Sequence, residues 1–122
     1  MILQSKDGRR RFEVYEQNWH FLMGLLAHDM KEDTTLLLTK DSTFLDRYEC
    51  DEISDNIKSA LTENIVYEVW DGKKIEPLFN PTTKILTDLK KMAQPITEKR
   101  KEFLLKLAGF LKDNNKLEIS FE

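Results

Sequence analysis

The sequence contains few of the residues that form metal sites. One cysteine and two histidines occur among its 122 residues. The histidines, His20 and His28, fall in one predicted helix, where eight residues extend about 12 Å along the axis. They therefore cannot share a metal ion, and Cys50 alone does not complete the four ligands of a structural zinc site. We predict no metal site and no cofactor.

Cys50 is also a poor candidate for a disulfide or a nucleophile. A single cysteine cannot form an internal disulfide, and the acids Glu49, Asp51 and Glu52 surround it in the sequence. Neighbouring negative charge raises the pKa of a thiol and lowers its reactivity. We interpret Cys50 as a small, half-buried structural side chain.

Long apolar runs and glycine-rich loops are missing as well. The longest apolar candidate, residues 19–27, is interrupted by His20 and Gly24 and falls short of the roughly 20 residues that cross a bilayer. The first seven residues offer no apolar stretch behind a basic head and no small-residue cleavage site, which argues against a signal peptide. The glycines are isolated, so no phosphate-binding loop is present. We expect a cytoplasmic protein that neither enters a membrane nor binds nucleotides.

Acidic side chains are plentiful, yet none forms a distinctive catalytic pattern. Asp51, Glu52 and Asp55 occupy adjacent turns at a predicted helix start, and carboxylates can serve as general acids or bases. Acids are favoured in a first helical turn by the helix dipole alone, however, so their placement has a sufficient structural cause. We predict no catalytic residue and a protein that is not an enzyme.

The composition is that of a globular protein with one core. Apolar residues make up 40% of the chain and charged residues 34%, and the length matches one typical domain. We therefore predict a single domain over residues 1–122. The expected fold class is α+β, dominated by about four helices with two or three short strands. Residues 1–11, which hold Lys6 and Arg9 to Arg11, could form a flexible basic arm.

Four segments show the spacing of amphipathic helices. The first follows Asn18, whose side chain makes a good N-cap. The second begins at Asp51 or Glu52, the third after Asn80, and the fourth at Pro95. Their apolar faces consist of Trp19, Leu22, Met23, Leu26 and Met30 in the first; Ile53, Ile57, Ala60 and Leu61 in the second; Ile85, Leu86, Leu89, Met92 and Ala93 in the third; and Ile96, Phe103, Leu104, Leu107, Phe110 and Leu111 in the fourth.

Alternation of polar and apolar residues predicts the strands. It occurs in residues 11–16 and again in residues 117–121 at the end of the chain. Residues 34–39 favour a short extended segment, with helix as the alternative. Residues 65–69 fit either a strand or the end of the second helix, and Asp71 with Gly72 terminates either one. Pro77 and Pro81 bracket a predicted loop.

Charge is unevenly distributed along the chain. The net charge is −3 overall, but +3 over residues 1–12, −10 over residues 13–72 and +4 over residues 73–122. If the fold keeps these stretches apart, one face would attract a basic protein and repel nucleic acid phosphate. The basic residues near the start have no interleaved aromatic platform, so we expect no binding to nucleic acid.

The densest acidic run provides the candidate binding site. Arg47 is the only basic residue in this run. The run could be a solvated face or an interface for a basic protein, whose opposite potential would speed the encounter. Reversing the charge of Glu49, Asp51 and Glu52 should then slow association. The candidate partner-binding residues are Asp46, Glu49, Asp51, Glu52 and Asp55.

Three stretches resemble parts of a known class of protein. They are residues 18–27, which form a tryptophan-led helix, residues 53–61, and the segment from Glu102 through Phe110 to the ending at residues 117–120. They are similar to immunity proteins, the small acidic bacterial proteins of polymorphic or contact-dependent toxin systems. The resemblance implies that the chain binds a cognate toxin, often a basic nuclease, and blocks its action directly. The alternative is a small regulatory or adaptor domain that binds a protein other than a toxin.

Overall fold

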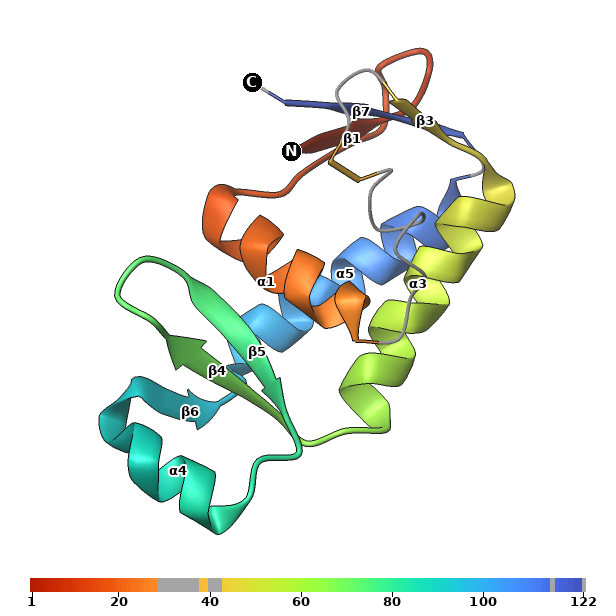
Figure 1. Ribbon diagram of the computed structural model, residues 1–122. Helices are drawn as coiled ribbons and strands as arrows, with labels where there is room; N and C mark the ends of the chain where they lie inside the picture. Colours follow the sequence, from red (N-terminus) through yellow and green to blue (C-terminus); the bar gives the residue numbers. More distant parts are fainter. Residues whose placement is uncertain (29–37, 40–42, 115, 122) are drawn as a thin grey trace.

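The computed structural model describes residues 1–28, 38–39, 43–114 and 116–121, and within them it has an α+β fold (Figure 1). Four α-helices are present in these residues, as predicted, but there are seven strands instead of two or three. The helices are α1 (Glu16–Ala27), α3 (Arg47–Thr62), α4 (Thr83–Leu89) and α5 (Glu98–Asp113), with a 3₁₀ turn, η1, at Lys90–Met92. Most of the additional strands are only three residues long, too short to show an alternating pattern.

The strands form two separate antiparallel sheets. Sheet A contains β1 (Ile2–Gln4), β2 (Arg11–Glu13), β3 (Thr43–Leu45) and β7 (Leu117–Ser120), in the order β2-β1-β7-β3. Sheet B contains β4 (Val66–Trp70), β5 (Ile75–Phe79) and β6 (Ala93–Pro95), in the order β5-β4-β6. The predicted strands at residues 11–16 and 117–121 are β2 and β7, and residues 66–69 belong to a strand, β4, rather than to the second helix.

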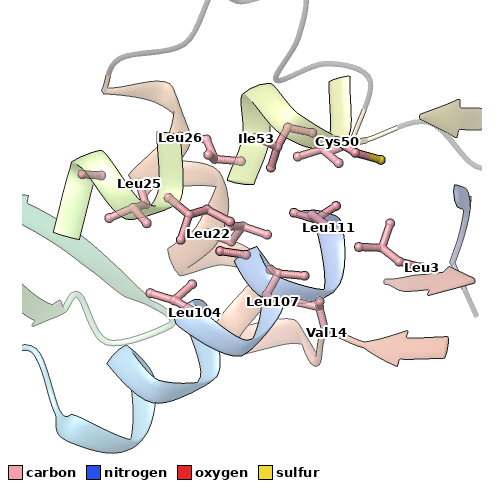
Figure 2. Packing of buried hydrophobic residues seen from close by; sticks show 14 of the residues in the cluster. Leu3, Val14, Leu22, Leu25, Leu26, Cys50, Ile53, Leu104, Leu107 and Leu111 are labelled. Carbon is pink, nitrogen blue, oxygen red and sulfur yellow. The ribbon is translucent and has the colours of Figure 1, made fainter. Parts of the chain in front are cut away.

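The core lies among α1, α3 and α5, between the two sheets; α3 packs against both α5 and α1, and α1 crosses in front of α5 in Figure 1. Figure 2 shows leucines of α1 and α5 converging on Ile53 and Cys50 of α3. On α5 the positions Leu104, Leu107 and Leu111 follow the helical repeat and are almost fully buried. A buried leucine contributes roughly 1.5–3 kcal/mol relative to an exposed one. The predicted apolar stripe of this helix is therefore confirmed from Phe103 to Leu111, whereas Ile96 precedes the helix.

Two helices begin earlier than the sequence predicted. α3 starts at Arg47, not at Asp51 or Glu52, because Asp46 and Glu49 form a reciprocal capping box. α1 starts at Glu16, and Asn18 is not its N-cap. Instead, the amide oxygen of Asn18 accepts a hydrogen bond from Arg100 Nε at 3.2 Å.

Two of the three prolines that were expected at a loop or a helix start lie in sheet B, and Pro81 lies between β5 and α4. Pro77 is in the edge strand β5, where its missing N–H costs no ladder bond on the open side, and Pro95 ends β6. α5 begins only at Glu98, since the hydroxyl of Thr97 caps it by accepting from Arg100 N at 3.2 Å. The predicted turn at Asp71 and Gly72 is confirmed, with Gly72 at φ +97°.

Residues 1–11 contain β1, the exposed turn that follows it and the first residue of β2, and they do not form an arm. β1 pairs with β2 on one side and with β7 on the other, which places it inside the sheet. Ile2 and Leu3 are buried there, and burying these apolar side chains favours the strand. The prediction of an arm rested on the basic residues of the segment and overlooked these two. The extended segment predicted at residues 34–39 lies outside the described residues except for Leu38 and Thr39, which form a turn. No helix of the described part has the length and apolar character needed to cross a bilayer.

Candidate functional site

The five acids of the candidate site all lie at or near the N-terminal half of α3. The opposite face of this helix carries Ile53, Ile57, Ala60 and Leu61 into the core. Ser54 is also buried, and its hydroxyl donates to the backbone oxygen of Ala108 at 2.7 Å, which fixes α3 against α5. The acids are therefore presented by a rigid element with one face anchored.

Asp46 and Glu49 have a structural task at the start of α3. Asp46 Oδ1 accepts from Glu49 N at 2.9 Å, while Glu49 Oε1 accepts from Asp46 N at 3.0 Å. The two carboxylates thus satisfy backbone donors that would otherwise lack a partner at the helix end. Substituting either residue would weaken the helix as well as alter the surface.

Asp51 and Asp55 meet a cation from the neighbouring helix. Lys112 Nζ on α5 lies 3.8 Å from Asp51 Oδ1 and 3.4 Å from Asp55 Oδ1. Arg47 Nε approaches the other oxygen of Asp51 at 3.7 Å. Asp51 Oδ1 is buried without a hydrogen bond, because 3.8 Å is an ion-pair separation and too long for a hydrogen bond. Both charges are thus partly compensated within the protein.

The charge segregation seen in the sequence is therefore not preserved in space. α5 belongs to the basic end of the chain, yet it packs along α3, the helix of the acidic middle. The Lys112 side chain of α5 reaches the carboxylates of Asp51 and Asp55 on α3. The acidic face is narrower than the sequence suggested, because only part of the run remains uncompensated.

Glu52 is the acid of the run that stays available. It is exposed and makes no ion pair or side-chain hydrogen bond among the described residues. Its helical neighbours at spacings of four and three are Tyr48 and Asp55, so these three residues share one side of α3. We call Tyr48, Glu52 and Asp55 the α3 outer face.

Tyr48 is the functional candidate that the sequence analysis missed. Its side chain is 86% exposed, the highest value among the large apolar and aromatic residues that the structure describes as exposed. Phe44, on the edge strand β3 just before the helix, is 50% exposed, and Lys116 Nζ lies 5.5 Å from the centre of its ring. Aromatic side chains are enriched at protein interfaces.

A signal for Tyr48 was present in the sequence. The capping-box pattern of Asp46 and Glu49 marks the true start of α3 and adds one turn to it. Projected on the extended helix, Tyr48 falls opposite Ile53 and Ile57 and must face solvent. The later start predicted at Asp51 or Glu52 left Tyr48 outside the helix and hid this arrangement.

The chemistry available near the site does not favour a thiol reaction. Burial, followed by the charges of Glu49, Asp46 and Asp51, raises the pKa of the Cys50 thiol to about 11. The thiol is fully buried and neutral at physiological pH. Within the described residues, no group of three or more His, Cys, Asp or Glu side chains could hold a metal ion.

Comparisons of the chain with protein families, with curated proteins and with solved structures find no match.

Proposed function

We propose that this chain acts by binding a basic protein through the α3 outer face, and that it performs no reaction of its own. The observation that carries the proposal is the exposure of Tyr48, which is 86% exposed at the N-terminal end of that face. Leaving an aromatic ring in water forgoes the free energy of burying it. A partner that covers Tyr48 would recover this energy, since tyrosine is among the residues that dominate binding hot spots.

The charges around Tyr48 specify the kind of partner. Glu52 carries an uncompensated carboxylate beside the ring, and Asp55 is shared with Lys112 across the helix pair. A basic surface would gain charge-assisted hydrogen bonds to these groups and would be steered toward them before contact. An acidic surface would be repelled. The face therefore favours a basic partner with a pocket for one tyrosine.

We further propose that the partner is a toxin that this chain neutralises, as in immunity proteins. The support is the resemblance of residues 18–27, 53–61 and 102–120 to that class, together with the acidic and aromatic character of the α3 outer face. A nuclease toxin binds phosphate with basic residues, so an acidic face can bind those same basic residues. Neutralisation would then be occlusion of the substrate path.

The experiment pairs the chain with the protein encoded by the adjacent upstream gene. Both are produced in one host, and growth is measured with the chain present and absent. The expected result is that the neighbouring product arrests growth and the chain restores it, while Tyr48→Ala combined with Glu52→Lys does not. Asp88→Lys on α4 serves as the charge-matched control, because Asp88 is exposed and unpaired within the described residues.

Three outcomes would count against the proposal. If the neighbouring product is harmless, or is harmful and not neutralised, the toxin assignment is wrong and the adaptor alternative takes its place. If the doubly substituted chain protects as well as the original, the α3 outer face is not the interface. If Asp88→Lys fails to protect as well, the effect reflects net charge and not a site.

A further inference from the structure

A second exposed surface, opposite in charge to the α3 outer face, lies at the hairpin end of sheet B. It is formed where the end of β4 and the start of β5 meet η1 and β6, at the far side of the molecule from the start of α3 (Figure 1). Trp70 is 43% exposed and Met92 is 51% exposed. A small slot of about 140 Å³ separates them, and Ile75, Lys91 and Gln94 help to line it.

Lys91 lines the slot, and the segments that form it contain further lysines. Residues 70–75 and 90–94 contain Lys73, Lys74, Lys90 and Lys91 against a single acid, Asp71. Lys74 pairs with Glu76 at 3.1 Å, whereas the other three make no ion pair among the described residues. We call the surface formed by Trp70, Lys73, Ile75, Lys90, Lys91 and Met92 the basic tip.

The carboxylate at the base of the slot does not offset these lysines. Glu68 also lines the slot, but it is only 3% exposed and its charge is paired with Arg100 from α5. Asp71 stays charged, although its Oδ1 accepts from the amides of Lys73 and Lys74 at 2.8 Å each. Lys73, Lys90 and Lys91 outnumber this one exposed acid, so the net charge of the two segments is positive.

The backbone at the basic tip is strained at one position. Lys90 has φ +53° and ψ −125°, a conformation that L side chains with a Cβ rarely adopt. Such a residue costs on the order of 1–3 kcal/mol and persists only where the surroundings hold it. Here it ends α4 and turns the chain so that Lys91 and Met92 reach the slot.

We propose that the basic tip is a docking site for an acidic polypeptide segment that inserts one apolar side chain between Trp70 and Met92. The slot has room for a single side chain, and the apolar part of its lining, Trp70, Ile75 and Met92, favours an aliphatic one. The lysines would pair with carboxylates on either side of this anchor. A lysine ammonium is a hydrated point charge, whereas an arginine guanidinium binds one carboxylate through two parallel hydrogen bonds. Lysines therefore suit a loosely arranged acidic segment better than a single, fixed acidic group.

This proposal does not depend on the proposed function. It concerns other residues, at the opposite side of the molecule, and a partner of opposite charge. The α3 outer face could fail its test while the basic tip passes, or the reverse.

The test uses the whole chain and a synthetic acidic peptide that carries one leucine between aspartates and glutamates. Binding is followed by NMR, through the indole signal of Trp70. A second peptide replaces the leucine with serine, and a third replaces the acids with their amides. We expect saturable binding of the first peptide, weakened about ten-fold when either the leucine or the charges are removed, which corresponds to about 1.4 kcal/mol for each.

Two variants locate the site. Lys91→Glu should weaken the first peptide by about ten-fold or more, and Met92→Ala by several-fold, because each removes one component of the slot. Lys84→Glu, on α4 and outside the slot, makes the same charge change and should alter the affinity less than two-fold, as only long-range potential is affected. Circular dichroism confirms that each variant is folded.

Several results would overturn the proposal. If the first peptide shows no saturable binding at low salt, the surface is not a docking site for an acidic segment. If the serine peptide binds as tightly as the leucine peptide, the slot has no role in binding. Equal loss with Lys84→Glu would show unspecific attraction. Tighter binding to vesicles of anionic lipid or to a single-stranded oligonucleotide, with the same residues perturbed, would assign the surface to a different class of partner.

Discussion

The carboxylate of Glu68 on β4 and the guanidinium of Arg100 on α5 form an ion pair inside the protein, with 3% and 12% of the two side chains exposed. The second oxygen of Glu68 accepts from the amide and hydroxyl of Thr97 at 2.8 and 3.0 Å. Arg100 also bonds Asn18 and lies 5.1 Å above the ring of Phe21. One network thus joins sheet B to both α5 and α1.

Removing one partner of this pair should strongly destabilise the fold. Glu68→Ala leaves the Arg100 guanidinium buried and uncompensated, which typically costs about 3–5 kcal/mol. The free energy of unfolding in urea measures the effect. Glu102→Ala is the control, since Glu102 and Lys106 form an exposed pair at 3.2 Å that should contribute about 0–1 kcal/mol. Similar losses for the two substitutions would contradict a structural role for the buried pair.

Two glycines in the helices should respond to alanine with opposite signs. A Cβ at Gly24 on α1 would stand 2.7 Å from the ring of Pro77 on β5, so the helix and strand would have to separate. We expect Gly24→Ala to cost about 1–3 kcal/mol. Gly109 on α5 has nothing within 4 Å of the added atom, and Gly109→Ala should stabilise by up to about 1 kcal/mol. Thermal unfolding of both variants checks the contrast, and a shift of the same sign in both would refute it.

Cys50 should be unreactive in the native protein. Its thiol is fully buried, and the pKa raised to about 11 keeps it protonated at neutral pH. An aromatic disulfide reagent at pH 8 should label less than a few per cent of the chain over the time in which it labels the urea-unfolded chain completely. Rapid labelling of the folded protein would show that the start of α3 opens readily.

The turn between β4 and β5 should weaken in acid. The backbone amides of Lys74 and Lys73 hold the pKa of Asp71 below its ordinary value of 3.8. A carboxyl whose pKa is lowered by folding adds stability above its unfolded pKa and loses it as the pH falls through the folded value. NMR titration should therefore give a pKa for Asp71 below 3.8, with loss of amide protection at Lys73 and Lys74 as it protonates. An Asp71 pKa at or above 3.8 would disagree with this geometry.

The periodic parts of the fold were predictable from the sequence. The stripe on α5 and the inner face of α3 follow the helical repeat over many residues, so burial of one face is the only satisfactory arrangement. The alternation in β7 and the turn at Asp71 and Gly72 were equally readable. In each case a local pattern and the global packing require the same structure.

The remaining features depend on contacts that no local pattern reveals. β1 and β6 are three residues long, and they are strands because neighbours from distant parts of the chain pair with them. Pro77 lies in β5, which pairs with β4 and packs against α1 near Gly24. For the candidate site, the acidic run was identified, but the compensation of Asp51 and Asp55 by Lys112 required knowledge that α5 packs against α3. Recognising the capping box would have revealed Tyr48.

The most direct test of the central claim is the rate of association between this chain and the purified product of the upstream gene, measured by stopped flow at two salt concentrations. We predict that Glu52→Lys slows association about ten-fold at low salt and less at high salt, because steering by an exposed charge is screened. Tyr48→Ala should instead speed dissociation, roughly 30-fold for the loss of about 2 kcal/mol. Asp88→Lys should leave both rates nearly unchanged. Rates for Glu52→Lys and Tyr48→Ala equal to those of the original chain would contradict binding through the α3 outer face.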